Sequence, residues 1–117
     1  MNWQSLQSSS QLADIATESA HQPVLIFKHS TRCNISRATL DRLERNWKDE
    51  TAPAKLYFLD LLSYRQLSDQ IAQQFGVEHE SPQVLIIKNG KAIFHRSHFD
   101  IDYASIREVL NQGAVKN

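Results

Sequence analysis

The apolar residues of this chain follow two different periods, and the changes between them mark the predicted elements. Short runs rich in branched or aromatic residues are typical of buried strands. Such runs occur at residues 24–28, 56–59, 83–88 and 91–97. Between these runs, apolar residues recur every three or four positions, which is the spacing of a helix that buries one face. These stripes predict four helices, at residues 8–20, 33–47, 63–75 and 103–110.

Turn and cap signals indicate where several of these elements begin or end. Ser63 followed by Gln66 has the spacing of a capping box, and Gly76 can end the third helix. Asn89-Gly90 is a strong hairpin signal, so the last two strands should be antiparallel. We expect residues 113–117 to be frayed.

The order of these elements, αβαβαββα, predicts the fold. A strand–helix–strand crossover is right-handed and joins parallel strands. The hairpin then adds two antiparallel strands after the third helix. We therefore expect an α/β protein with one thioredoxin-like domain over residues 1–117, in which helices flank both faces of a mixed four-stranded sheet.

The composition of the chain limits the classes of function that we expect. Of the 117 residues, 41% are hydrophobic, which fits one compact domain. Lys plus Arg and Asp plus Glu both number 13, so a strongly basic nucleic-acid binder is not expected. No apolar run is long enough to span a bilayer, and the N-terminus lacks the pattern of a signal peptide. We expect a soluble cytoplasmic protein that binds neither nucleic acid nor membrane.

The single cysteine is the first candidate for chemistry. Cys33 lies between the predicted first strand and the predicted second helix, at the start of that helix. A helix N-terminus stabilises a thiolate. Arg32 and Arg37 add positive charge nearby. Ser36 takes the place of the second cysteine in a C-x-x-C pair, so its hydroxyl can hydrogen-bond the sulfur but cannot form a disulfide. The alternative is a small buried hydrophobic residue without chemistry.

Ser81-Pro82, at the head of the third strand, is the second candidate. Proline can open a strand but not occupy its middle. In a thioredoxin-like arrangement this bond is cis and lies beside Cys33, which leaves the backbone of Ser81 free to pair with a thiol ligand. The alternative is an ordinary trans proline at a strand edge.

The remaining polar candidates concern histidines. His29 and His79 stand near strand ends, where structural hydrogen bonding is the simpler interpretation. His98 ends the fourth strand, which returns to the edge that carries Pro82. With N–H groups of the last helix, His98 could hold a carboxylate of a small thiol, and a solvated loop histidine is the alternative. No set of residues has metal-ligand spacing, so we expect no metal site.

The chain resembles the monothiol bacilliredoxin family, a thioredoxin-like family associated with the low-molecular-weight thiol bacillithiol. The resemblance runs from about Phe27 to His98. It rests on four stretches of the sequence: His29–Ser36 (HSTRCNIS), Gly76–Gln83 (GVEHESPQ), Asn89-Gly90 and Ser97-His98. One stretch departs from the family, which usually has Thr-Cys-Pro-Ile-Ser around the cysteine. Here Arg32 precedes Cys33, and Asn34 replaces the proline, which restores a backbone N–H at the helix start.

The resemblance implies a thiol–disulfide oxidoreductase that removes bacillithiol, or a similar thiol, from mixed disulfides on client proteins. In that interpretation Cys33 and Ser36 are catalytic, and five residues bind the thiol: Arg32, Asn34, Ser81, Pro82 and His98. No cofactor stays bound, and the small thiol is a co-substrate. Without a second cysteine, an external reductant must end the cycle.

Two other interpretations stay open. A monothiol glutaredoxin that uses glutathione could share this fold, and two copies could hold an iron–sulfur cluster between their Cys33 thiolates. A thioredoxin-like binding module without enzymatic activity is the other, because a fold does not determine an activity.

Overall fold

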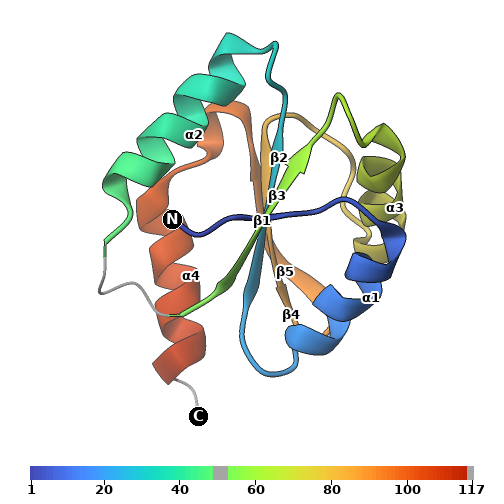
Figure 1. Ribbon diagram of the computed structural model, residues 1–117. Helices are drawn as coiled ribbons and strands as arrows, with labels where there is room; N and C mark the ends of the chain where they lie inside the picture. The colour runs from blue at the N-terminus through green and yellow to red at the C-terminus, as the bar shows by residue number, and fades with distance from the viewer. Residues whose placement is uncertain (49–52, 116–117) are drawn as a thin grey trace.

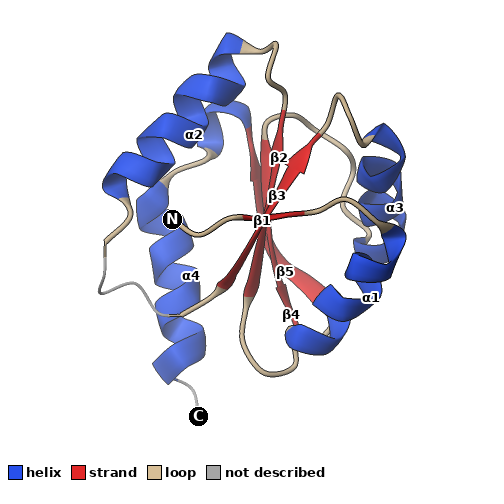
Figure 2. Cartoon of the chain, viewed as in Figure 1, coloured by secondary structure: helices blue, strands red, loops and turns tan. Residues whose placement is uncertain are grey.

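The computed structural model describes residues 1–48 and 53–115, which form a sheet with helices on both faces (Figures 1 and 2). The elements follow one another as β1 (Gln4–Ser5), α1 (Ser9–Glu18), β2 (Val24–His29), α2 (Asn34–Asn46), β3 (Lys55–Asp60), α3 (Arg65–Phe75), β4 (Gln83–Lys88), β5 (Lys91–Ser97), the 3-10 helix η1 (His98–Asp100) and α4 (Tyr103–Val115). Helices α1 and α3 cover one face of the sheet, and α2 and α4 cover the other.

The sheet has the strand order β1-β3-β2-β4-β5. Strand β2 is parallel to β3 and antiparallel to β4, and β5 is antiparallel to β4. Asn89 and Gly90 form the turn between β4 and β5, and both have a positive φ, of 52° and 75°. A two-residue hairpin turn of this kind favours Asn-Gly, because few other residues adopt that backbone conformation readily. The predicted mixed sheet and its hairpin are confirmed.

Three details of the prediction are wrong. The sheet has a fifth strand, β1, whose two residues pair with β3 opposite Tyr57 and Phe58. Helix α3 begins at Arg65, and Ser63 does not form the predicted capping box with Gln66. The Ser63 hydroxyl instead donates to a carboxylate oxygen of Asp60 at 2.9 Å. Helix α4 continues to Val115, and the expectation for residues 116–117 lies outside the described residues.

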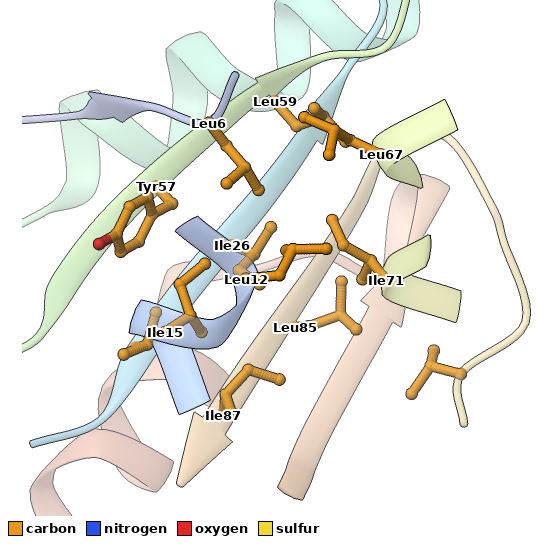
Figure 3. Close-up of a cluster of buried hydrophobic side chains, with 12 residues drawn as sticks. Leu6, Leu12, Ile15, Ile26, Tyr57, Leu59, Leu67, Ile71, Leu85 and Ile87 are labelled. Carbon is orange, nitrogen blue, oxygen red and sulfur yellow. The ribbon is translucent and has the colours of Figure 1, made fainter. Parts of the chain in front are cut away.

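The core lies on both faces of β2, which is buried along its whole length. Val24 and Ile26 join the cluster under α1 and α3 (Figure 3), while Leu25 and Phe27 join the cluster under α2 and α4. Burying one such side chain contributes roughly 1.5–3 kcal/mol. Because β2 is central and doubly covered, the loop that follows it starts from a rigid support.

Within residues 1–48 and 53–115, no helix combines the length and the apolar character needed to cross a membrane.

Candidate active site

The predicted site residues come from three segments that meet at one edge of the sheet. The register pairs Lys28 of β2 with Gln83 of β4, and Gln83 in turn with Ser97 of β5. The carboxyl end of β2, the amino end of β4 and the carboxyl end of β5 therefore lie together, at the upper edge in Figure 1. The N–H of His98 donates to the carbonyl oxygen of Pro82 at 2.9 Å, which joins the last two segments directly.

Cys33 is the N-cap residue of α2. Its backbone is extended, with φ −101° and ψ 117°, and its side chain is half-buried. The Cys33 N–H donates to the carbonyl oxygen of Ser30, and its carbonyl oxygen accepts from the N–H of Arg37. The first N–H groups of a helix have no partner within the helix, so they point toward the N-cap side chain. Cys33 therefore stands at the N-terminal end of α2, although its side chain makes no hydrogen bond to the helix N–H groups.

Ser36 is fully buried at the third position of α2, and its hydroxyl oxygen has two neighbours. It accepts a hydrogen bond from the N–H of Ser30 at 3.1 Å, and it lies 2.7 Å from Nδ1 of His29. These contacts tie the first turn of α2 to the end of β2. In the described part of the chain, no hydrogen bond joins the Ser36 hydroxyl to the sulfur of Cys33, which differs from the expectation, because the hydroxyl is engaged by Ser30 and His29 instead.

His29, the last residue of β2, is buried against the rings of Phe27 and Phe58. Burial lowers the pKa of His29 below its ordinary value of 6.5. The carboxylate of Asp60 opposes this change and the guanidinium of Arg37 adds to it. The imidazole is therefore neutral near pH 7, with a hydrogen on only one of its two nitrogens.

The peptide bond between Ser81 and Pro82 is cis, which is the geometry expected from the sequence. Pro82 is buried. The hydroxyl oxygen of Ser81 is also buried, and it contacts no hydrogen-bonding partner among the described residues. The cis bond lies at the same sheet edge as the start of α2, so the backbone around Ser81 and the sulfur of Cys33 share that edge.

His98 lies at this edge with a positive φ of 55° and an exposed side chain. Its Nε2 lies 3.4 Å from a carboxylate oxygen of Glu80, so a ligand carboxylate would compete with that side chain. The N–H groups at the start of α4 offer less help than expected, because Asp102 already accepts from the N–H of Ser105 at 2.7 Å. Nothing in the sequence pattern indicated the Glu80 contact.

Arg32 and Asn34 flank Cys33, and both are exposed. The Asn34 side-chain oxygen accepts a hydrogen bond from Nη2 of Arg37 at 2.7 Å. The residue that replaces the family's proline therefore holds the Arg37 guanidinium on the first turn of α2. Arg32 precedes Cys33 in the chain and is exposed.

A second polar group lies at the same edge, on the face that α3 covers. Lys28 is fully buried, and its Nζ contacts no hydrogen-bonding partner among the described residues, as is also true of Oε1 of Gln83. Burial lowers the pKa of Lys28 to about 8, against the opposing effect of the Asp69 carboxylate. Beside it, Nδ1 of His79 lies 2.8 Å from the hydroxyl oxygen of Ser68.

In the part of the chain that the structure describes, no three His, Cys, Asp or Glu residues are grouped so that they could hold a metal ion.

Comparison with known families assigns the chain to one of them. The family model of the monothiol bacilliredoxin BrxC matches residues 4–106. The chain belongs to the monothiol bacilliredoxin family. The description names a family of thiol oxidoreductases, and this chain has one cysteine, Cys33, which is the N-cap of α2.

Solved structures show which fold the chain shares. One is described as a candidate oxidoreductase with a thioredoxin fold; it is 32% identical, with a TM-score of 0.73 over 89% of each chain. Thioredoxin from Malassezia sympodialis is 20% identical, with a TM-score of 0.70 over 95% of this chain and 90% of that one. Thioredoxin from Fasciola hepatica is 15% identical, with a TM-score of 0.71 over 93% and 97%. The predicted thioredoxin-like fold is confirmed.

Proposed function

We propose that this bacilliredoxin removes bacillithiol from mixed disulfides on client proteins. The observation that carries the proposal is the position of Cys33, the only cysteine of the chain, as the N-cap of α2 at the edge that also holds the cis bond before Pro82. A half-buried sulfur is accessible to a ligand, and reactive cysteines are commonly found at helix N-termini.

The exchange needs only one protein thiol. The Cys33 thiolate attacks the bacillithiol sulfur of the mixed disulfide, so a new S–S bond forms while the old one breaks. The electron pair of the broken bond leaves on the client cysteine, which departs as a thiolate. Cys33 then carries the small thiol as a mixed disulfide. A second thiolate, from free bacillithiol or a reductase, attacks the sulfur of the bound small thiol, and Cys33 leaves as a thiolate. An internal disulfide cannot form, because the chain has no second cysteine.

Three features of the edge support binding of a small anionic thiol. The exposed guanidinium of Arg32 can attract a carboxylate, and the backbone of Ser81 can pair with an extended ligand. The half-buried sulfur of Cys33 lies at the same edge of the sheet as Ser81, and Cys33 directly follows Arg32 in the chain. His98 contributes to the same ligand only where its contact with Glu80 opens, so we assign the stronger attraction to Arg32.

Intact-mass measurement tests the proposal. The reduced protein is incubated in parallel with bacillithiol disulfide and with glutathione disulfide, and Cys33→Ser serves as the control. We expect one bacillithiol adduct on the wild-type protein, little glutathione adduct, and none on the variant. A second incubation, with a client peptide that carries bacillithiol on its cysteine, should transfer the adduct to Cys33 and free the peptide.

The other results of this experiment would contradict the proposal in different ways. An adduct with glutathione alone would identify a glutaredoxin-like activity. An unmodified protein with both disulfides would identify a binding module without exchange activity. Arg32→Gln should weaken the bacillithiol reaction without changing the reaction with a neutral disulfide.

A further inference from the structure

The sheet edge that holds Cys33 carries charges of both signs, on two different segments. Arg32, in the segment that follows β2, is exposed and positively charged. Glu80 stands in the segment that leads into β4, directly before Ser81 and the cis bond. Because β2 and β4 are neighbours in the sheet, the two segments leave it at adjacent positions of the upper edge in Figure 1. A ligand at this edge is therefore bordered by a cation from one segment and a carboxylate from the other.

The carboxylate of Glu80 is only loosely held. Its contact with Nε2 of His98 is 3.4 Å long, and the exposed fractions of the two side chains are 45% for Glu80 and 51% for His98. A charge-assisted hydrogen bond to a carboxylate is usually about 2.7–2.9 Å long, so this exposed contact is a weak one. Within residues 1–48 and 53–115, no other ion pair and no hydrogen bond engages this carboxylate.

Two other carboxylates close to this edge are engaged more firmly. The two carboxylate oxygens of Asp60 accept hydrogen bonds from the loop that follows β3, at 3.2 and 2.9 Å. Those of Asp102 both accept from Ser105, at 2.7 and 3.0 Å. Glu80 differs from both, because a cation on a ligand can replace the imidazole beside it without breaking a short hydrogen bond.

We propose that Glu80 is a specificity-determining residue that binds the ammonium group of a thiol ligand. The ammonium takes the place of the His98 imidazole beside the carboxylate. The inference rests on the proposed function in taking Cys33 as the nucleophile and the backbone of Ser81 as a binding group. Glu80 and Ser81 are consecutive, with Cα atoms about 3.8 Å apart, so the ammonium and the group that pairs with Ser81 belong to the same part of the ligand.

This role names a class of substrate: thiols with a free amino group beside the sulfur. The cysteinyl part of bacillithiol has such a group, whereas the cysteine nitrogen of glutathione is part of a peptide bond. A carboxylate attracts an ammonium and repels a second carboxylate. Glu80 therefore favours a thiol that carries both charges over one that is only negative, while Arg32 attracts the negative part.

Three small symmetric disulfides of different charge test the role of Glu80. Cystamine is positive, 2-hydroxyethyl disulfide is neutral, and 3,3′-dithiodipropionate is negative. In each reaction the Cys33 thiolate attacks one sulfur, forms a mixed disulfide and releases the other half as a thiolate. Intact-mass measurement follows the adduct, and each rate is divided by the rate with the neutral probe. Comparing these ratios between variants cancels the intrinsic reactivity of the probes.

We expect Glu80→Gln to lower the cystamine ratio about threefold at low salt, which is the size of one exposed charge pair. The ratio for the negative probe should rise. Glu80→Lys should make the protein prefer the negative probe, and added NaCl should bring the wild-type cystamine ratio toward that of Glu80→Gln. Ratios that stay unchanged in both variants would overturn the proposal.

Two other exposed carboxylates provide matched controls. Glu78→Gln changes the same loop, Asp100→Asn changes η1, and neither should alter the cystamine ratio. A decrease in either control equal to that in Glu80→Gln would show that only the overall charge of the edge matters, which contradicts a specific role for Glu80.

None of the three probes contains bacillithiol, so the two proposals can fail separately. If the protein reacts with bacillithiol disulfide but the ratios do not depend on Glu80, the proposed function stands and the role of Glu80 falls. If the ratios depend on Glu80 but bacillithiol disulfide does not react, Glu80 selects a different amino thiol and the proposed function falls. A protein that reacts with none of these disulfides would contradict both.

Discussion

Two histidine–serine pairs lie at the same edge of the sheet, on opposite faces. His29 and Ser36 lie on the face covered by α2, 2.7 Å apart, and His79 and Ser68 lie on the face covered by α3, 2.8 Å apart. The first pair adjoins the N-cap cysteine of α2. The second adjoins the buried ammonium of Lys28, whose charge helps to lower the pKa of His79. The same two side chains therefore meet in two different surroundings.

The comparison of the two pairs distinguishes side chains expected to affect the reactivity of Cys33 from side chains expected to affect only the stability of the fold. On the α2 face, the pair ties the end of β2 to the first turn of the helix that begins after Cys33, the proposed nucleophile. On the α3 face, a serine and a histidine satisfy each other among buried polar groups, and we expect their exchange of hydrogens to have no effect on Cys33. Changes on the α3 face should alter stability alone, while changes on the α2 face should alter stability and reactivity together.

The largest change in stability is expected for Lys28→Met, which tests the α3 face. Lowering of the Lys28 pKa from 10.5 to about 8 corresponds to about 3 kcal/mol of cost for the buried charge. Replacement by an apolar side chain of similar length should therefore raise the free energy of unfolding at pH 7 by about 1–3 kcal/mol. Urea unfolding measures this gain, and the alkylation rate of Cys33 should stay unchanged.

The pH dependence of this gain has a definite sign. Between pH 8 and 10.5 the unfolded chain holds a proton on Lys28 that the folded chain lacks, so the wild-type protein becomes more stable as pH rises. The advantage of Lys28→Met should shrink over that window. Lys91→Met, at an exposed position of β5, should change stability by less than about 0.5 kcal/mol. A variant that is less stable than wild type at pH 7 would show that the ammonium stabilises the fold.

A smaller and more specific effect is expected from paired serine substitutions. Ser36→Ala and Ser68→Ala each remove the partner of a histidine, which should cost about 1–3 kcal/mol. Ser36→Ala should cost more, because the N–H of Ser30 also loses its acceptor. Only Ser36→Ala should slow the alkylation of Cys33 near pH 7. Equal slowing by Ser68→Ala would remove the distinction between the two faces.

The smallest effect is expected from acid. Burial lowers the pKa of both His29 and His79, so below about pH 6.5 the unfolded chain binds protons that the folded chain does not. Their contribution to stability is complete above that pH and is lost as pH falls. The urea midpoint of the wild-type protein should therefore decrease from pH 7 to pH 5, and less so in His29→Leu or His79→Leu. His95→Gln, at an exposed position, is the control.

Local patterns in the sequence were sufficient for most of the fold. The strands and helices followed from periodicity because the burial of one helix face or both faces of a strand leaves a regular spacing of apolar residues. The start of α2 at Cys33 and the turn at Asn89-Gly90 followed from short-range signals of the same kind. Strand β1 did not, because two exposed polar residues pair with β3 through the backbone alone and leave no pattern.

The tertiary structure decided which polar groups meet. The sequence by itself determined that one thiol would stand at a helix start and that a proline would open β4. It could not determine that Ser36 would be shared with His29, that Glu80 would lie against His98, or that Lys28 would be buried without a partner. The spacing of apolar residues shows only which side chains are buried. A hydrogen bond between two side chains depends on which segments the fold brings to about 3 Å from each other.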